Sequence, residues 1–95
     1  MEPVEYPING ELDLHLFQPR EAKPLVEDYL QACLEKGILE VRVVHGKGKG
    51  VLARTVHHTL ERLEIVESFE LATAPQGGWG ATIVRLKPPD TLDPP

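Results

Sequence analysis

Two kinds of spacing alternate along the chain and divide it into segments. Residues 11–15 alternate apolar and polar side chains with period two, which is typical of a half-buried strand. Residues 38–44 are apolar except for Glu40 and Arg42, which favours a largely buried strand in a parallel pair. Between these segments, apolar residues recur every four positions as on one face of a helix: Leu25, Tyr29 and Cys33, and Val26, Leu30 and Leu34.

The second half of the chain repeats this order and ends in two strands. A second helical stripe lies within residues 51–63 and is made by Leu52, Val56, Leu60 and Leu63. Residues 65–72 and 81–86 are predicted strands, with Phe69 and Leu71 pointing inward. The glycine-rich stretch between these two strands can close a hairpin.

The predicted order is therefore β-α-β-α-β-β. Because crossovers between parallel strands are right-handed, both helices should cover the same face of the sheet. We expect an α/β (α+β) two-layer sandwich, with a four-stranded mixed sheet and two helices on one face. The first helix has two compatible starts, since Pro19 suits a first helical position but Pro24 should break the ladder one turn later. Either a separate turn covers residues 19–23, or the helix begins near Pro24.

Length and composition bound the protein to one small domain. The chain has 95 residues, of which 41% are hydrophobic and 26% charged, as expected for a folded globular domain. We predict an extended arm at 1–10, a folded unit at 11–87 and a Pro-rich acidic tail at 88–95. The single cysteine, Cys33, falls in the helical stripe and is expected to be buried. No apolar run long enough for a membrane and no signal peptide is present, so we expect a cytoplasmic protein, with a monomer compatible with its size.

The charge distribution points to a different partner from the net charge. The formal net charge is −5, which argues against nucleic acid. Between Val41 and Leu60, however, there is no Asp or Glu, and the window holds four Lys or Arg residues and three histidines. A local basic surface on an acidic protein is the expected footprint of DNA or RNA binding. A chance cluster in so short a chain is the alternative.

A glycine-lysine loop lies inside this basic window, between the second strand and the second helix. His45 is followed by Gly46, Lys47, Gly48, Lys49 and Gly50. Glycine lets the backbone approach a ligand closely, and free N–H groups at a helix start attract anions. This stretch predicts a phosphate-binding turn, against the alternative of a solvated connector. Arg54, in the first turn of the helix, is a candidate phosphate contact, and Trp79 either stacks on a base or packs against the sheet.

Three candidate catalytic side chains should converge near this loop. Asp13 and His15 end the first strand, and His45 ends the second. Parallel neighbours end at the same edge of a sheet, where open α/β sheets bind ligands. Two imidazoles can serve as base and acid in phosphodiester cleavage, with Asp13 orienting one of them. RNA supplies its own 2′-hydroxyl nucleophile, whereas a divalent metal ion, Mg or Mn, would help water attack DNA.

Other interpretations of these residues remain open. Asp13 and His15 can simply satisfy backbone groups in the turn after the strand. Together with His45 they can also form a zinc site, although no fourth ligand is evident. His57 and His58 point about 100° apart on a helix and are expected to be surface residues.

Three motifs together resemble the Smr (small MutS-related) domain. They are Leu12-Asp13-Leu14-His15, then 45–50, then Gly77-Gly78-Trp79-Gly80-Ala81-Thr82-Ile83-Val84, in the family's order and spacing. The resemblance implies a fold like the C-terminal domain of the bacterial initiation factor that binds the small ribosomal subunit. It implies nucleic-acid binding and, in several members, cleavage of DNA or of RNA, including messenger RNA on stalled ribosomes.

The resemblance makes Asp13 and His15 the catalytic candidates and assigns 45–48 to nucleic-acid contact and activity. One departure concerns catalysis: many members have glycine after the first motif, where this chain has Leu16. The leading hypothesis is a small free-standing endonuclease. The alternative is a non-catalytic module that binds nucleic acid or ribosome-associated RNA.

Overall fold

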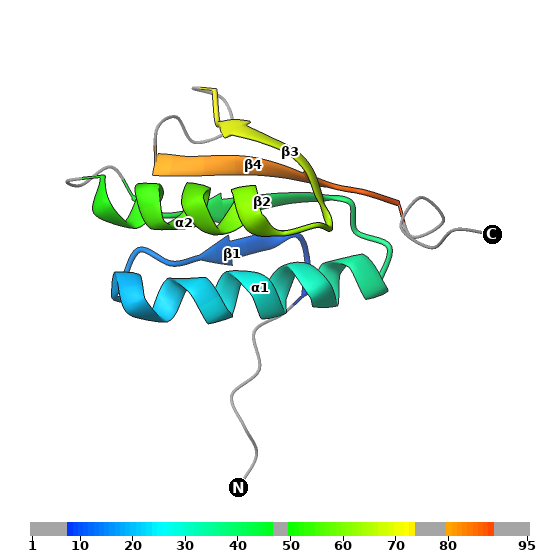
Figure 1. Cartoon of the computed structure of the whole chain (residues 1–95), viewed down its shortest axis with the longest axis horizontal. Helices are drawn as coiled ribbons and strands as arrows, with labels where there is room; N and C mark the ends of the chain where they lie inside the picture. Colours follow the sequence, from blue (N-terminus) through cyan, green and yellow to red (C-terminus); the bar gives the residue numbers. More distant parts are fainter. Residues whose placement is uncertain (1–7, 47–49, 74–79, 89–95) are drawn as a thin grey trace, which may run out of the picture.

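The computed structural model describes residues 8–46, 50–73 and 80–88. Residues 1–7 of the predicted arm and 89–95 of the predicted tail lie outside these residues. The described elements are β1 (Glu11–Asp13), α1 (Pro19–Glu35), β2 (Glu40–Val44), α2 (Val51–Arg62), β3 (Val66–Leu71) and β4 (Ala81–Leu86), as drawn in Figure 1. The β-α-β-α-β-β order predicted from hydrophobic spacing is confirmed.

The strands form one mixed sheet in the order β1-β2-β4-β3. β1 pairs with β2 in parallel, and Asp13 lies opposite Val44. β4 lies between β2 and β3 and is antiparallel to both. The ends of β1 and β2 and the starts of β4 and α2 therefore meet at one edge (Figure 1). We call this edge the carboxyl rim and define it as residues 13–17, 45–46, 50–54 and 80–82.

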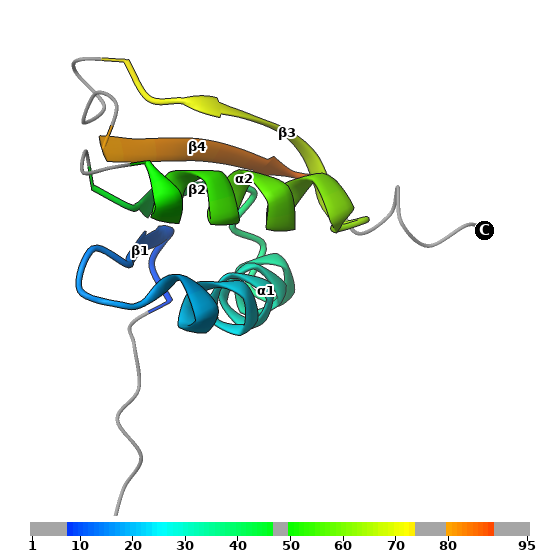
Figure 2. The same ribbon diagram turned by 60° about the vertical axis from the view of Figure 1, so that its left-hand side comes forward.

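Both helices pack on the same face of the sheet, as Figure 2 shows. Alternate strand residues point into the shared core, among them Val41, Val43, Val84 and Leu86. The helices contribute the other half of this core, with Val26, Leu30 and Cys33 from α1 and Val56 and Leu60 from α2. Burial of this apolar surface is the main force holding the two layers together. The two-layer architecture and the buried Cys33 thiol are both as predicted.

The predicted break in the first helix is wrong: α1 begins at Pro19, which suits a first helical position, and runs unbroken through Pro24, so neither a separate turn at 19–23 nor a start near Pro24 is found. Proline removes one intrahelical hydrogen bond, but Pro24 is exposed, so water can bind the carbonyl left without its partner. Ala22, one turn into the helix, is fully buried. Packing on both sides of Pro24 thus keeps the first turn in line with the rest.

Two strand predictions also need correction. β1 ends at Asp13, although the N–H of Leu14 still donates to the carbonyl of Val44 (2.6 Å), so His15 lies in the following turn. Leu71 was expected to point inward and is 48% exposed. It ends β3, an edge strand with only one neighbour, so little of the core reaches it. Phe69, two residues earlier, does pack against the core.

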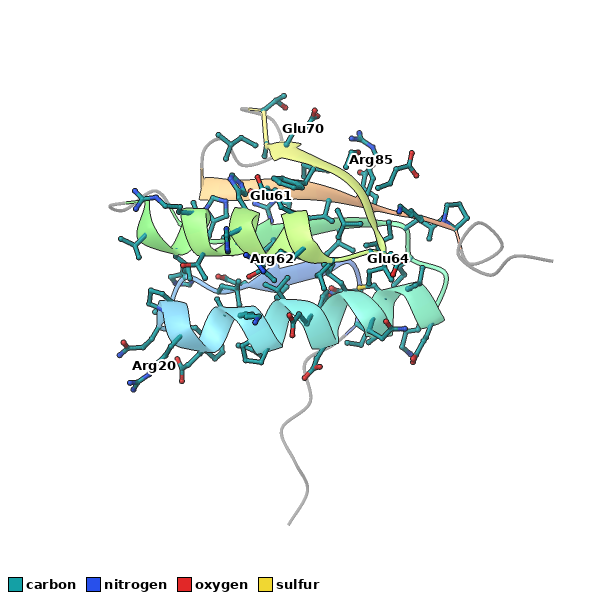
Figure 3. All side chains as sticks on the ribbon, in the orientation of Figure 1. Arg20, Glu61, Arg62, Glu64, Glu70 and Arg85 are labelled. Carbon is teal, nitrogen blue, oxygen red and sulfur yellow. The ribbon has the colours of Figure 1, made fainter. Side chains whose placement is uncertain are left out.

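The sheet face away from the helices carries cross-strand ion pairs. Arg85 lies within 4.0 Å of carboxylate oxygens of both Glu40 and Glu70, and Figure 3 shows Glu70 beside Arg85. Arg42 pairs with Glu11 on the neighbouring strand. Opposite charges across strands favour the observed register. Among the described residues, none of the helices is long and apolar enough to cross a membrane.

Candidate functional site

Asp13 and His15 form an exposed pair at the carboxyl rim. Oδ1 of Asp13 lies 2.5 Å from Nδ1 of His15, and the same oxygen accepts the backbone N–H of His15 at 3.0 Å. The flanking residues Leu12 and Leu14 are buried, so the strand's period-two alternation directs Asp13 outward and anchors the turn. The two side chains are 54% and 51% exposed and are therefore accessible to a ligand.

The pair has a defined proton arrangement. Two hydrogen bonds from His15, chiefly that of its side chain and next that of its backbone N–H, lower the pKa of Asp13. The lowered pKa keeps the Asp13 carboxylate ionised. An ionised carboxylate only accepts, so Nδ1 of His15 carries the hydrogen. In neutral His15 the lone pair is then on Nε2, on the side of the ring away from Asp13. This is the arrangement in which a carboxylate fixes the tautomer of a catalytic imidazole.

An open cavity of about 460 Å³ joins His15 to the end of the second strand. Its lining includes His15, Phe17, His45, Gly46, Gly50 and Val51. Gly46 has φ +84°, and a Cβ there would lie 3.7 Å from that of His15. His15 and His45, 30 positions apart in sequence, thus line one cavity, because β1 and β2 are parallel neighbours.

The start of α2 opens into the same cavity, and among the described residues no side chain caps its first backbone N–H groups. Gly50 caps the helix with φ +83° and no side-chain hydrogen bond, and the first turn has no acidic residue. Free N–H groups and the helix dipole favour an anion here. The exposed Arg54 adds a cation in the same turn, whereas Glu64 lies beyond the far end of α2 (Figure 3). The start of α1 differs, because Glu21 accepts the N–H of Gln18 there.

His45 occupies a different environment from His15. Its side chain is nearly buried, with the whole residue 4% exposed. Nδ1 lies 3.1 Å from the carbonyl oxygen of Gly46, and Nε2 lies 2.8 Å from the hydroxyl of Thr82. Both ring nitrogens therefore have partners within the fold. A catalytic role for His45 stays a prediction, and these contacts favour a role in holding the turn.

The prediction that His57 is a surface residue is wrong. His57 is half-buried, and its Nε2 lies 2.7 Å from the same Thr82 hydroxyl. Its ring packs against Phe69 with centroids 5.2 Å apart. The sequence carries one signal for this cluster: Thr82 is in phase with the core residues Val84 and Leu86, and a polar side chain on a core face needs a buried partner. His58, by contrast, is exposed as expected.

Other predicted site residues do not meet at the cavity or lie outside the described chain. Arg42, part of the basic window, pairs with Glu11 on the open face of the sheet. Lys47, Gly48, Lys49 and Trp79 lie outside the described residues. Within residues 8–46, 50–73 and 80–88, no three His, Cys, Asp or Glu side chains gather into a metal-binding group. The zinc alternative therefore gains no support from the described side chains.

Comparison with known proteins assigns the chain to a family. A family model described as the Smr domain matches residues 12–87. The chain is 42% identical over 79 residues to a protein of Carboxydothermus hydrogenoformans named Endonuclease MutS2, covering 83% of this chain and 10% of that protein. A Clostridium tetani protein of the same name is 35% identical over 80 residues, covering 84% of this chain and 10% of that protein. The chain thus spans about a tenth of the length of these relatives.

Solved structures agree with this assignment. The Smr domain of Thermus thermophilus MutS2 is 36% identical with a TM-score of 0.81, and the match covers 84% of this chain and 100% of that one. YdaL, a stand-alone small MutS-related protein from Escherichia coli, is 27% identical with a TM-score of 0.79, covering 87% of this chain and 68% of that one. By its motifs, its fold and these matches, the chain belongs to the Smr domain family.

Proposed function

We propose that this Smr domain binds nucleic acid at the carboxyl rim and cleaves a phosphodiester bond there, with His15 as the proton-transferring group. The observation that carries the proposal is the Asp13–His15 pair, 2.5 Å apart and exposed beside the open start of α2. The name Endonuclease MutS2, borne by relatives up to 42% identical over this domain, supports it. The Asp13–His15 pair lies within the part of the chain that matches the family, because the family match begins at Leu12.

The phosphate would bind where backbone donors and positive charge coincide. The first turn of α2 offers N–H groups that no side chain caps, and Arg54 lies in that turn. The loop lysines Lys47 and Lys49 would add positive charge close by. Charge that develops on phosphorus during cleavage would be stabilised by these donors. A phosphate at this place lies in the cavity that His15 lines.

His15 would act as a base through Nε2, since Asp13 holds Nδ1. In RNA, Nε2 takes the proton of a 2′-hydroxyl, the 2′-oxygen bonds to the adjacent phosphorus, and the P–O5′ bond breaks. The 5′-oxygen takes its proton from water, and His15 later releases the proton it took up, so the products are a 2′,3′-cyclic phosphate and a 5′-hydroxyl. For DNA, Asp13 with phosphate oxygens offers ligands that Mg²⁺ accepts, and such an ion would supply an activated water.

A second function, binding without cleavage, is favoured by one specific contact. Oδ1 of Asp13 accepts the backbone N–H of His15, so the carboxylate also closes the turn after β1. This contact would be needed in a purely structural motif. The exposed Leu16 also replaces the glycine common in the family. Under this alternative the rim still binds phosphates, and the domain cleaves neither DNA nor RNA.

Cleavage of end-labelled DNA and RNA, with and without a chelator, separates the two functions. We expect the wild type to cut at least one substrate, and His15→Ala to bind that substrate nearly as well but not cut it. His58→Ala is the matched control, because His58 is an exposed histidine on α2 that lines no cavity described here. Binding without cleavage under all conditions would support the non-catalytic alternative. Absence of binding at low salt would contradict both, since phosphate contacts strengthen as salt falls.

A further inference from the structure

Three side chains, two at the carboxyl rim and one farther along α2, form a hydrogen-bonded chain that the proposed chemistry does not use. His45 follows β2, Thr82 lies in β4, and His57 lies in α2. Thr82 is fully buried, and its hydroxyl is the shared partner of both imidazoles, at 2.8 Å and 2.7 Å. The two rings meet edge to face with centroids 5.9 Å apart. Buried polar groups that share partners in this way constrain one another strongly.

The direction of every hydrogen bond follows from the carbonyl of Gly46. A carbonyl oxygen only accepts, so Nδ1 of His45 must donate to it. In a neutral ring Nε2 of His45 is then an acceptor, and the Thr82 hydroxyl must donate to it. The hydroxyl oxygen in turn accepts the Nε2–H of His57. The chain therefore runs from His57 through Thr82 and His45 to the carbonyl of Gly46.

The opposite direction is chemically inconsistent with a neutral His45. If Nε2 of His45 carried the hydrogen, the lone pair on Nδ1 would face the carbonyl oxygen of Gly46. If both nitrogens of His45 carried hydrogens, the Thr82 hydroxyl would accept from Nε2 of His45 and would have to donate its own proton to Nε2 of His57. An imidazolium there would also be a nearly buried charge. Burial lowers the pKa of His57, the nearby His45 ring adds to this, and Glu61 opposes it, which favours the neutral form of His57.

This chain of hydrogen bonds ends on Gly46, which lines the cavity beside His15. The N–H groups of His45 and Gly46 both donate to the carbonyl of Gly80, at 2.8 Å and 2.9 Å. Nδ1 of His45 holds the carbonyl of Gly46. These hydrogen bonds hold the peptide units on both sides of Gly46. They thereby fix Gly46 in the left-handed conformation, φ +84°, which glycine tolerates. Gly46 lines the cavity beside His15, so its orientation sets the cavity wall.

We propose that Thr82 and His57 are positioning residues, which act through His45 to fix Gly46 and with it the wall of the cavity where the phosphate would bind. Phe69 of β3 supports the outer end of the chain by packing on the His57 ring. The chain joins the residue after β2 to β3, β4 and α2, so the conformation of Gly46 depends on all four elements. The consequence for phosphate binding rests on the proposed function, whereas the hydrogen-bond chain itself does not.

The imidazole tautomers test the chain directly, by ¹⁵N and ¹H NMR of the full chain at neutral pH. We expect Nδ1–H on His45 and Nε2–H on His57. In Thr82→Val, which removes the hydroxyl but keeps the branched shape, His45 should keep its Nδ1–H, because the Gly46 carbonyl still accepts it. The ¹⁵N shift of Nε2 of His45 should move to that of a nitrogen without its donor, and Thr82→Ser should restore the wild-type shift. A wild-type His45 with its hydrogen on Nε2, or on both nitrogens, would overturn the proposal whether or not the protein binds nucleic acid.

Oligonucleotide affinity tests the positioning role. We expect Thr82→Val to weaken binding of a labelled oligonucleotide about tenfold, and Thr82→Ser to bind as the wild type does. His57→Phe, which keeps a ring against Phe69 but loses the donor, should weaken binding, and His57→Gln, which keeps a donor, should weaken it less. If Thr82→Val does not fold, the comparison of His57→Phe with His57→Gln tests the positioning role by itself.

Wild-type binding by folded Thr82→Val and His57→Phe would overturn the positioning role. If the wild type binds no oligonucleotide, the proposed function fails, and the tautomers still decide whether the chain exists.

Discussion

Two histidines line one cavity at the carboxyl rim, each just beyond the end of a parallel strand, and their surroundings differ. His15 is half exposed and bonded through one nitrogen to an ionised carboxylate, Asp13. His45 is nearly buried, and both of its nitrogens have partners. An imidazole with an accessible nitrogen can exchange protons with a substrate, whereas one with both nitrogens engaged chiefly fixes its neighbours. Position at a strand end alone therefore does not define a histidine's role.

The largest expected effect concerns the exposed member of this comparison. Replacing His15 by alanine should lower the cleavage rate about 10²–10⁴-fold, the usual contribution of a general acid or base. Single-turnover assays on the substrate that the wild type cuts measure this loss. Oligonucleotide affinity should change little, because the first turn of α2 remains intact. A His15→Ala protein that cleaves as fast as His58→Ala would contradict the catalytic role of His15.

The buried member should affect stability instead. His45→Ala leaves the buried Thr82 hydroxyl proton without its acceptor and the Gly46 carbonyl without its side-chain donor. An unsatisfied buried group costs about 1–3 kcal/mol. His15→Ala, at a half-exposed site, should change the free energy of unfolding by no more than about 0.5 kcal/mol. Urea denaturation of the two variants gives both values. Equal destabilisation by the two substitutions would contradict the assignment of His45 to the fold.

The pH dependence of stability should follow the buried cluster. Burial lowers the pKa of His57 below its ordinary value of 6.5, so the unfolded chain binds a proton more readily than the folded one. The contribution of His57 to stability is therefore full above pH 6.5 and is lost as the pH falls through and below that value. Urea midpoints between about pH 7.5 and pH 5 should show this fall in the wild type. The fall should be smaller in His57→Gln, and an identical pH slope would contradict the prediction.

The Asp13 carboxylate should respond in a lower pH range. Its hydrogen bonds to His15 lower its pKa, so the ionised form is favoured in the fold. Its contribution is present above its ordinary value of 3.8 and is lost only as the pH falls further. The pKa of Asp13 from carboxyl ¹³C NMR should rise toward that ordinary value in His15→Ala. An unchanged pKa in that variant would show that another group stabilises the carboxylate.

The smallest expected effect concerns the cation near the cavity. Arg54→Gln should weaken oligonucleotide binding a few-fold and reduce the slope of log affinity against log salt by about one. Arg62→Gln is the matched control, because Arg62 is an exposed arginine in the last turn of the same helix (Figure 3). Fluorescence titrations at several salt concentrations measure both slopes. Equal changes in the two variants would indicate that net charge, rather than the rim, governs binding.

Leu16 shows how far the family motif could be used without a structure. The sequence identified it as a departure from the glycine that many members of the family have after the first motif. It is 85% exposed, and its N-terminal neighbour His15 keeps the hydrogen bond to Asp13. The departure therefore leaves the exposed pair intact in the fold. Its partner in the motif, Leu14, is fully buried, as the period-two pattern predicts.

The sequence by itself determined the elements and the convergence of the two strand ends. Hydrophobic spacing is local, so it identified strands within residues 11–15 and 38–44, which the structure has at 11–13 and 40–44, and the two helices that follow them. The convergence of His15 and His45 then follows from parallel pairing of neighbouring strands. The continuity of α1 through Pro24 could not be predicted, because packing on both sides of the proline outweighs its local preference.

Only the tertiary structure decided what surrounds each histidine. Burial of His45 depends on Thr82, 37 residues away, and on His57, which reaches Thr82 from α2. Sequence spacing does not report which helix face meets which strand, because the insertion of β4 between β2 and β3 is a long-range pairing. That insertion places the Thr82 hydroxyl between the two rings. The chain order thus assigned both histidines to one rim, and the packing of β4 left one exposed and buried the other.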